Sequence, residues 1–218
     1  MGGSAKPEGG YDKKTMARDT YELLRSLGHS EAHIAGEDIG SMVAYSFAAN
    51  HPEATTKLAL WEVGHPDELF NEMRLLPQPG LSGPWWFAFN QIDGLPEQLL
   101  AGRSRLLIDW MIDFQSRDPG AFSEDDRARY AAAYDQPGAV RAGNGWYQTF
   151  GQDIVDARGY AKLTMPVLAL GGLYYPYVTA LLEGKATDPR LVELAGAGHY
   201  LAEERPDDLV RELTAFLG

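Results

Sequence analysis

A chain of 218 residues and 24.0 kDa is long enough to bury one sizeable hydrophobic core, so we expect one domain with a large insertion. The net charge of −12 and the pI near 4.8 argue against nucleic acid or an anionic membrane surface as a partner. The absence of cysteine excludes disulfides, thiolate metal sites and a cysteine nucleophile. The sequence holds no apolar run near the ~18 residues that span a bilayer, and residues 1–7 lack the apolar segment of a signal peptide. We therefore expect a cytoplasmic protein.

The first part of the chain predicts a βαβ unit. Residues 1–14 predict a loop, and Thr15 is the predicted N-cap of a helix that ends at Gly28. The predicted apolar face of this helix consists of Met16, Leu23, Leu24 and Leu27. Residues 32–36 predict a strand, a sharp turn and a helix follow, and Thr56–Glu62 predicts a second strand. Strand, helix and strand in this order indicate a parallel sheet.

Residues 66–164 break this alternation and predict helices instead. Aromatic residues cluster after Pro84, and we expect three helices, at 96–115, 123–134 and 136–150. The α/β pattern then resumes, with predicted strands at 166–171 and 191–195, a short helix at 179–183 and a last helix from Pro206. This pattern predicts an α/β core, residues 1–65 and 165–218, and a helical cap, residues 66–164, as is typical of a lidded enzyme.

The turn between the first strand and its helix contains the most informative motif, Gly36-Glu37-Asp38-Ile39-Gly40. We expect Gly36 and Gly40 to permit a bend too tight for residues with a Cβ. The bend holds Asp38 at the carboxyl end of the strand and over a helix N-terminus, where the helix dipole and free N–H groups favour an ionised carboxylate. Asp38 is therefore a candidate nucleophile, and the alternative is a solvated loop acid.

A catalytic carboxylate needs partners, and His199 and Glu62 are the candidates. His199 follows a predicted strand in a loop flanked by glycine, at the sheet edge where open α/β sheets bind ligands. A histidine that acts as a base needs an acid to set its tautomer. The loop at 171–177 contains no acid, whereas Glu62 ends the strand after Asp38. Asp38, Glu62 and His199 thus predict a nucleophile–acid–histidine set, with a solvated strand end as the alternative for Glu62.

These motifs carry a family resemblance. Gly-Glu-Asp-Ile-Gly-Ser, followed by Ala-Asn-His-Pro-Glu, resembles the α/β-hydrolase superfamily, in particular the epoxide hydrolase and dehalogenase branch with an aspartate nucleophile. Met-Pro-Val-Leu-Ala-Leu-Gly-Gly and Gly-Ala-Gly-His-Tyr-Leu-Ala-Glu-Glu-Arg-Pro support it. The acid at the end of the strand after Asp38, together with the segment at 84–90, looks most like Cif-type bacterial epoxide hydrolases. The resemblance covers essentially the whole chain and implies an α/β-hydrolase fold without a cofactor or metal.

The resemblance also implies residues that hold the leaving atom of the substrate. Tyr147 falls where the family places its lid tyrosine. Trp86 stands where epoxide hydrolases usually have histidine, and fluoroacetate dehalogenases use a tryptophan near this place to hold halide. The alternative for Trp86 is an ordinary aromatic of the lid core. The backbone N–H of Ile39 is the expected oxyanion donor. The aromatic side chains expected to line the substrate pocket are those of Trp85, Phe89 and Trp146.

Three departures from the family pattern qualify these expectations. Glu37 replaces the histidine that usually precedes the nucleophile. Ile39, Ser41 and Met42 stand where fluoroacetate dehalogenases have arginines for the substrate carboxylate, which argues against a carboxylate-bearing substrate. The His-Gly-x-Pro oxyanion loop and the first strands of the family are absent, so the predicted sheet is shortened at its N-terminal side.

The predicted reaction is hydrolysis of an epoxide to a diol through an alkyl ester on Asp38. The predicted substrate is a small apolar organic molecule. A hydrolytic dehalogenase with the same triad is one alternative. A catalytically silent domain that serves in assembly or binding is another, because half of the oxyanion hole is missing. The strand at 32–36 would have an unpaired edge, so we expect a homodimer through this edge. The alternatives are that residues 1–14 cover the edge or that the chain is only marginally folded.

Overall fold

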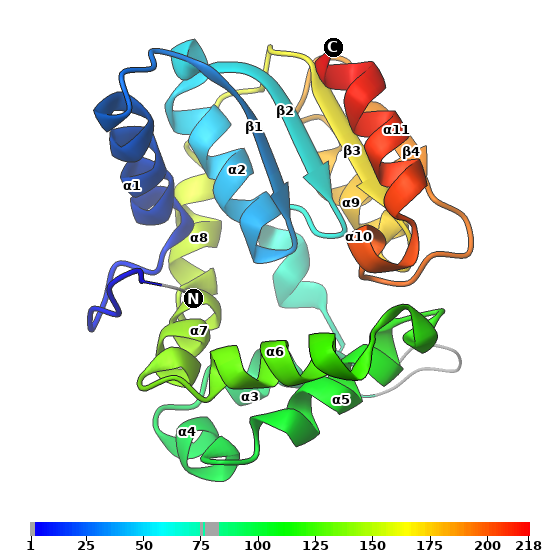
Figure 1. Ribbon diagram of the computed structural model, residues 1–218. Coiled ribbons are helices and arrows are strands. Elements are labelled where there is room, and N and C mark those ends of the chain that lie inside the picture. Colours follow the sequence, from blue (N-terminus) through cyan, green and yellow to red (C-terminus); the bar gives the residue numbers. More distant parts are fainter. Residues whose placement is uncertain (1–2, 75, 77–82) are drawn as a thin grey trace.

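The computed structural model describes residues 3–74, 76 and 83–218; residues 75 and 77–82 of the predicted insertion lie outside this range. Within the described residues, a four-stranded parallel sheet has the order β1-β2-β3-β4 (Figure 1). Its strands are β1 (Ala32–Glu37), β2 (Thr55–Trp61), β3 (Val167–Gly171) and β4 (Arg190–Glu193). The predicted strands are thus present, with ends that differ by one or two residues.

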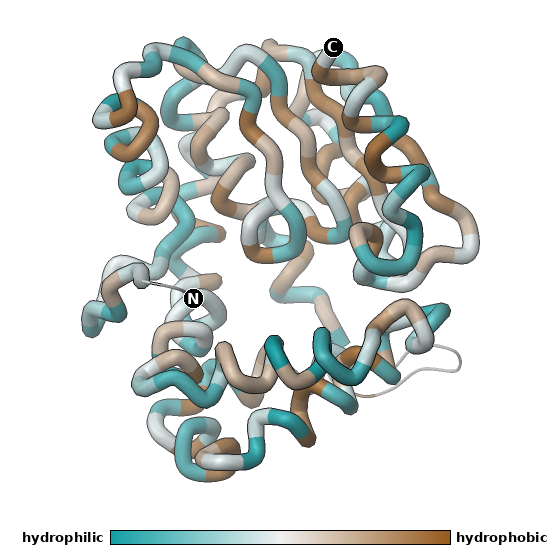
Figure 2. The backbone as a smooth tube through the Cα atoms, viewed as in Figure 1, coloured by the Kyte–Doolittle hydropathy of each residue, from teal (hydrophilic) through white to brown (hydrophobic). Residues whose placement is uncertain are grey.

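Helices cover both faces of this sheet. Around the strands lie α1 (Lys13–Ser26), α2 (Ile39–Asn50), α9 (Tyr175–Leu182), α10 (Leu201–Glu204) and α11 (Pro206–Leu217). Leu58 and Leu60 of β2 pack with α2 and α9 on one face, while Ala59 packs with α10 and α11 on the other. Every residue of β3 is buried, as expected for a parallel strand covered on both sides. Figure 2 shows the hydrophobic residues along β3 and α11.

The region between β2 and β3 is helical in the described residues, and it lies at the end of the sheet toward which β2 points (Figure 1). Its α-helices are α3 (Trp85–Asn90), α4 (Leu95–Leu100), α5 (Ser104–Gln115), α6 (Glu124–Tyr134), α7 (Ala139–Gln148) and α8 (Phe150–Ala157). This region also contains the short 3₁₀ helices η2 (Glu68–Glu72) and η3 (Pro119–Ala121), whereas η1 (Pro52–Ala54) precedes β2. The carboxyl edge of the parallel sheet therefore faces these helices.

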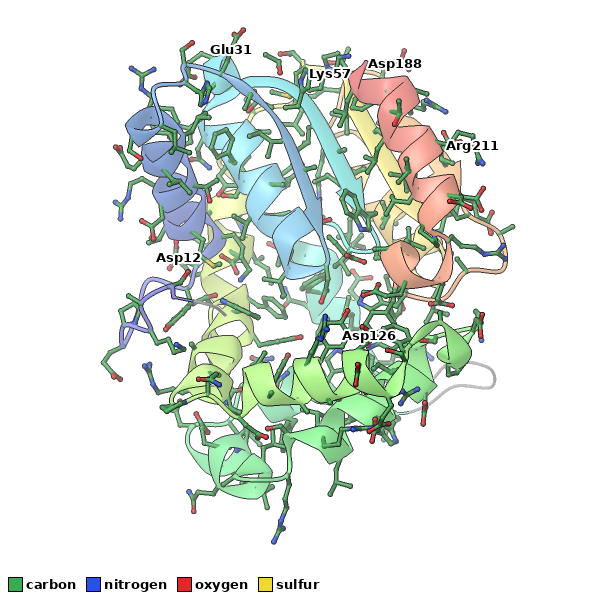
Figure 3. All side chains as sticks on the ribbon, viewed as in Figure 1. Asp12, Glu31, Lys57, Asp126, Asp188 and Arg211 are labelled. Carbon is green, nitrogen blue, oxygen red and sulfur yellow. The ribbon has the colours of Figure 1, made fainter. Side chains whose placement is uncertain are left out.

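Polar caps explain several helix ends. Ser123 and Asp126 form a reciprocal capping box that starts α6, as the predicted helix start at Ser123 requires. The side chain of Asp126 is labelled in Figure 3. Lys57 donates to the carbonyls of Phe216 and Leu217, at 2.8 and 3.0 Å, and so satisfies the last turn of α11.

Four details of the sequence interpretation are wrong. The predicted helix at 96–115 is two helices, because Gly102, with φ of 65°, interrupts it after α4. A further helix, α8, follows the predicted helix at 136–150. The N-cap of α1 is Asp12, whose carboxylate accepts from the N–H of Thr15 at 2.8 Å. Leu23 and Leu27 are exposed, and the buried face of α1 instead contains Lys13 and Ala17.

Residues 3–12 do not cover the edge of the sheet. They run beside α7, where Arg141 donates to the carbonyls of Lys6 and Pro7 and the ring of Tyr11 lies against Gly145. Among the described residues, β1 pairs only with β2. The described part of residues 1–14 therefore does not pair with this edge, contrary to that alternative.

Candidate active site

Asp38 lies at a strained turn between β1 and α2. Its φ of 50° and ψ of −121° fall in a region that residues with a side chain rarely adopt. A Cβ on Gly36 would overlap the carbonyl of Gly40, so glycine is required there. Gly40 has open space around its Cα, and the expectation that both glycines permit the bend holds only for Gly36. The Asp38 side chain makes no capping bond to α2 and is 42% exposed, so its carboxylate is free to meet a ligand.

His199 lies between two carboxylates. Its Nδ1 is 3.2 Å from Oε2 of Glu62, and its Nε2 is 3.9 Å from Oδ2 of Asp38. The backbone N–H of His199 donates to the carbonyl of Gln115 at 2.9 Å, which ties the loop before α10 to the end of α5. The three residues that the sequence places together are therefore neighbours, brought together by the carboxyl edge of one parallel sheet.

Glu62 is fully buried, and both of its carboxylate oxygens have hydrogen-bond partners. Oε1 accepts from the N–H of Gly172, Oε2 accepts from the N–H of Tyr174 at 3.4 Å, and the imidazole of His199 completes the set. Glu62 itself has φ of 72°. A Cβ on Gly172 would overlap the carbonyl of Gly198, so the glycine directly after β3 permits the close approach that brings its N–H to Glu62. The sequence interpretation did not assign this role to the 171–177 loop.

The two carboxylates control the charge of His199. Burial acts to lower the pKa of the imidazole, and Asp38 and Glu62 act to raise it. The carboxylates prevail, and the pKa of His199 is raised to about 10. At neutral pH the imidazole is therefore protonated as long as the Asp38 carboxylate is ionised.

Two cavities meet at these residues. One, of about 550 Å³, extends over Phe70, Phe87 and Tyr177. The other, of about 300 Å³, extends between α5, α6 and α7 and reaches Glu37 and Glu203. The side chains that line both cavities are those of Asp38, Trp86, Met111, Gln115, Tyr147 and His199. The site thus lies where the larger cavity, with its aromatic walls, meets the smaller cavity, whose wall contains acidic residues.

The predicted aromatic residues divide into two groups. Trp86 and Tyr147 line both cavities, and Phe89 lines the smaller one. Trp85 and Trp146 are not among the described residues that line either cavity, which corrects their predicted place in the pocket. The Trp85 ring packs on Trp110 at 5.1 Å between centroids, and Trp146 packs on the cluster around Met42. The reason is helical geometry: successive residues point about 100° apart, so the neighbours of Trp86 and Tyr147 must face elsewhere.

Several tyrosines near Asp38 were not singled out from the sequence. Tyr134, Tyr174 and Tyr200 line the cavities, and Tyr174 donates to Oε1 of Gln115 at 2.9 Å. Burial, and then the charge of Asp38, raise the pKa of Tyr147 well above its usual value, so this phenol keeps its proton. Tyr134 is the last residue of the predicted helix at 123–134, Tyr174 lies in the loop at 171–177, and Tyr200 directly follows His199. Proximity to those elements is a signal that could have identified them.

Ile39 is the first residue of α2, where the backbone N–H has no acceptor within the helix. In the part of the chain that the structure describes, no three His, Asp or Glu side chains form a group that could hold a metal ion.

The parallel sheet, the strained turn at Asp38 and the Asp38–His199–Glu62 cluster define a hydrolase of the α/β-hydrolase fold. The model of the alpha/beta hydrolase family matches residues 1–212, and the chain belongs to this family. None of the described helices is both long and apolar enough to cross a membrane.

Individual relatives agree with this assignment. A soluble epoxide hydrolase of Corynebacterium sp. (strain C12) is 28% identical over 96% of this chain and 75% of its own length. A fluoroacetate dehalogenase of Burkholderia sp. is 24% identical over 99% of this chain and 75% of its own. The crystal structure of Cfl2 from Burkholderia cenocepacia superimposes with a TM-score of 0.88 at 33% identity, covering 100% of this chain and 76% of the other.

Glu37, the residue before Asp38, has an unusual environment. Burial raises the pKa of its carboxyl group from 4.5 to about 7, with His199 acting to lower the pKa and Glu203 and Asp38 acting to raise it. A carboxyl group whose pKa is raised on folding stabilises the protein below the pKa of the unfolded chain. This contribution is lost as the pH rises through the pKa of the folded state.

We predict that Glu37→Gln changes the pH dependence of stability. Between pH 5 and pH 8.5 the wild-type protein should lose about 1–2 kcal/mol of unfolding free energy relative to the variant, less than the full shift implies because Glu37 is partly exposed. Thermal unfolding at both pH values measures this difference. The matched control is Glu193→Gln, an exposed glutamate at the end of β4. A constant difference between the wild type and Glu37→Gln at both pH values would contradict the prediction.

Proposed function

We propose that this hydrolase opens epoxides to diols through an alkyl ester on Asp38. The observation that carries the proposal is the position of the Asp38 carboxylate. It lies on a strained turn, 3.9 Å from a histidine that contacts a buried glutamate, and it shares a cavity with the Tyr147 phenol. A carboxylate is the suitable nucleophile because the ester that it forms can be hydrolysed. A serine would form an ether that cannot be.

In the first step, an oxygen of Asp38 attacks an epoxide carbon, and the carbon–oxygen bond of the ring breaks. Tyr147 donates a hydrogen bond to the leaving oxygen, as its raised pKa permits. The negative charge of Asp38 disappears when the ester forms. One of the two charges that raise the pKa of His199 is then gone, so the imidazolium becomes acidic enough to supply the proton that the alkoxide requires.

In the second step, the now neutral imidazole of His199 takes a proton from water, which attacks the carbonyl carbon of the ester. Glu62 holds the ring through Nδ1. The backbone N–H of Ile39 receives the developing oxyanion. Collapse of the intermediate releases the diol and restores both the Asp38 carboxylate and the protonated His199. The net reaction is epoxide plus water to diol.

We also propose that residues 66–164 act as a cap over a core of residues 1–65 and 165–218. Support comes from the cavities, whose walls combine residues of α3, α5 and α7 with Asp38 and His199 of the sheet edge. The larger cavity is lined mostly by aromatic and aliphatic side chains, which suits a substrate with an apolar body.

Hydrolytic dehalogenation by the same residues is the second candidate, and Trp86 is the observation that favours it. This side chain is 8% exposed and lines both cavities beside Asp38. An indole N–H donates a hydrogen bond but cannot transfer a proton, which suits a departing halide better than an alkoxide. The relative from Burkholderia sp. named as a fluoroacetate dehalogenase supports this alternative. A silent binding domain would contain the same residues but would form no ester.

We predict that the two catalytic steps separate on substitution. Asp38→Ala should form no covalent adduct with any epoxide, because the nucleophile is gone. His199→Gln should form the ester more slowly, because no imidazolium protonates the alkoxide, and should accumulate it, because water is no longer activated. Intact mass after incubation with a panel of small epoxides measures the adduct. Normal turnover by His199→Gln without an adduct would show that the roles are wrong, and no adduct in any protein would favour the silent domain.

We predict that Tyr147 and Trp86 have different effects on the two reactions. Tyr147→Phe should slow epoxide opening by about 10²-fold or more, because one positioned donor contributes roughly that much. Trp86→Phe should slow dehalogenation more than epoxide opening if the indole N–H binds halide. Diol formation and halide release from matched substrates measure the two effects. Equal, small effects of Trp86→Phe on both reactions would indicate a packing role.

We further propose that two copies of the chain pair through β1. The support is that β1 pairs only with β2 among the described strands, while residues 3–12 lie along α7. Every residue of β1 is exposed or partly exposed, so the unpaired N–H and C=O groups of this edge are open to another strand, and pairing would satisfy them. Size-exclusion chromatography with light scattering should give twice the chain mass of 24.0 kDa. A monomer at every concentration, with cooperative unfolding, would exclude this dimer.

A further inference from the structure

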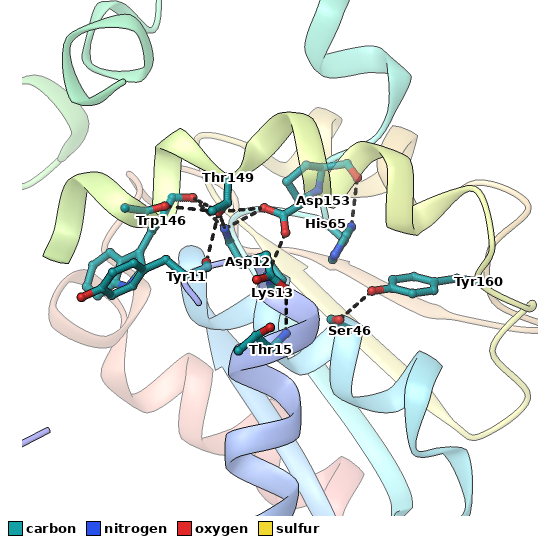
Figure 4. A network of polar contacts seen from close by, with 12 residues as sticks. Tyr11, Asp12, Lys13, Thr15, Ser46, His65, Trp146, Thr149, Asp153 and Tyr160 are labelled. Carbon is teal, nitrogen blue, oxygen red and sulfur yellow. Dashed lines mark hydrogen bonds and ion pairs between the residues drawn. The ribbon is translucent and has the colours of Figure 1, made fainter. Parts of the chain in front are cut away.

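Lys13 and Asp153 form an ion pair in which both side chains are fully buried. The Nζ of Lys13 lies 2.8 Å from Oδ2 of Asp153, and the backbone N–H of Lys13 donates to Oδ1 at 2.7 Å (Figure 4). Removing two charges from water costs more than a well-packed apolar pair of the same volume would, so stability alone does not account for this pair. The contacts that Lys13 makes besides Asp153 indicate its role.

The strongest of these contacts is with the last turn of α7. The Nζ of Lys13 donates to the carbonyl of Trp146 at 2.6 Å and lies 3.3 Å from Oγ1 of Thr149 (Figure 4). Carbonyls in the last turn of a helix lack donors within the helix, and a cation is favoured there by the helix dipole. Trp146 directly precedes Tyr147, so this hydrogen bond is made one residue away from the proposed donor to the leaving oxygen.

The same place is a break between two helices. Thr149 separates α7 from α8, and its N–H bonds to the carbonyl of Tyr147, two residues earlier, instead of continuing the helical pattern. A side chain that takes a carbonyl of the helical ladder is a known cause of such breaks. The direction in which α7 ends, and with it the direction of Tyr147, is therefore set where Lys13 binds.

A second contact reaches Tyr147 through an aromatic ring. The Nζ of Lys13 lies 5.1 Å from the centroid of the Phe150 ring, and that ring lies 5.3 Å from the ring of Tyr147. Phe150 also belongs to the buried cluster with Ile39 and Met42, beneath the strained turn. The cation thus contacts both the backbone before Tyr147 and the ring that packs against its phenol.

We propose that Lys13 is a positioning residue for Tyr147: by binding the Trp146 carbonyl at the α7–α8 break, it aims the phenol at the substrate atom that Asp38 displaces. This inference rests on the proposed function. Asp153 holds the cation in place, and α1, which carries Lys13, thereby becomes part of the leaving-group site although none of its residues lines the two cavities described above.

The test replaces both charges at once. Lys13→Met with Asp153→Leu leaves no unpaired charge in the interior, so this double variant should fold, whereas Lys13→Met alone leaves Asp153 unpaired and should unfold at lower temperature. The matched control is Arg158→Met with Glu68→Leu, which removes an exposed ion pair at the end of α8. Single-turnover kinetics with an epoxide then measure ester formation and ester hydrolysis separately.

The expected result is a split between the two steps. The Lys13/Asp153 double variant should form the ester about tenfold more slowly or worse, because small displacements of a donor are costly, and should hydrolyse it at the wild-type rate. In a protein that already carries Tyr147→Phe, Lys13→Met with Asp153→Leu should not slow ester formation any further. The control should match the wild type in both steps. Equal slowing of both steps in the folded double variant, or no slowing, would overturn the proposal.

A spectroscopic measurement keeps this test separate from the proposed function. In protein labelled with 3-fluorotyrosine, each tyrosine contributes a fluorine NMR signal. The signal that is missing from the spectrum of Tyr147→Phe is assigned to Tyr147. That signal should shift in the Lys13/Asp153 double variant and not in the control, whether or not the wild type opens epoxides. An unchanged signal would overturn the proposal, and absence of an ester in the wild type would count against the proposed function alone.

Discussion

A buried carboxylate is tolerated only if its charge is met, and Glu62 depends for this on two backbone N–H groups and the ring of His199. Most of the site follows from this interaction. The N–H groups come from the loop after β3, which can approach only because residue 172 is glycine. The ring contact leaves Nε2 of His199 facing Asp38. One buried acid thus aligns segments that follow three different strands.

The same electrostatics connect the arrangement to the proposed chemistry. Asp38 and Glu62 together outweigh the effect of burial and keep His199 protonated. Esterification of Asp38 would remove one of these charges at the moment when a base is required. The imidazole would therefore change from proton donor to proton acceptor in response to the chemical step, without any movement of the backbone. This switch requires both carboxylates to be near the ring.

The helical region contributes groups of a different kind. Trp86 and Tyr147 line the cavity with side chains that combine an aromatic ring with an N–H or O–H group, and under the proposed function these groups would hold the leaving atom. Their direction depends on where short helices begin and end. For Tyr147, the end of α7 is held by a cation that belongs to the first helix of the chain. Under the proposed positioning role of Lys13, residues far from the cavity would be coupled to its geometry.

The sequence alone predicted the strands of the sheet and the candidate residues of the site. Alternation of apolar runs and glycine-bounded turns predicted β1, β2, β3, β4 and α11, because strand and helix periods are local properties. The Gly36–Gly40 motif, the acid after β2 and the histidine in a glycine-flanked loop predicted residues that do meet, because parallel strands place their carboxyl ends at one edge.

Only the tertiary structure decided which neighbours face the cavity, and which polar residues are buried. Trp85 and Trp86 are adjacent residues of the same type. The packing of α3 on α5 and α7 directs Trp85 against Trp110 and Trp86 toward the cavity. Lys13 lies in the segment for which the sequence predicts a loop, and its burial depends on Asp153, 140 residues away. Leu23 and Leu27 read as core residues and are exposed. Such partners come from distant segments, and no local pattern in the sequence specifies the contact.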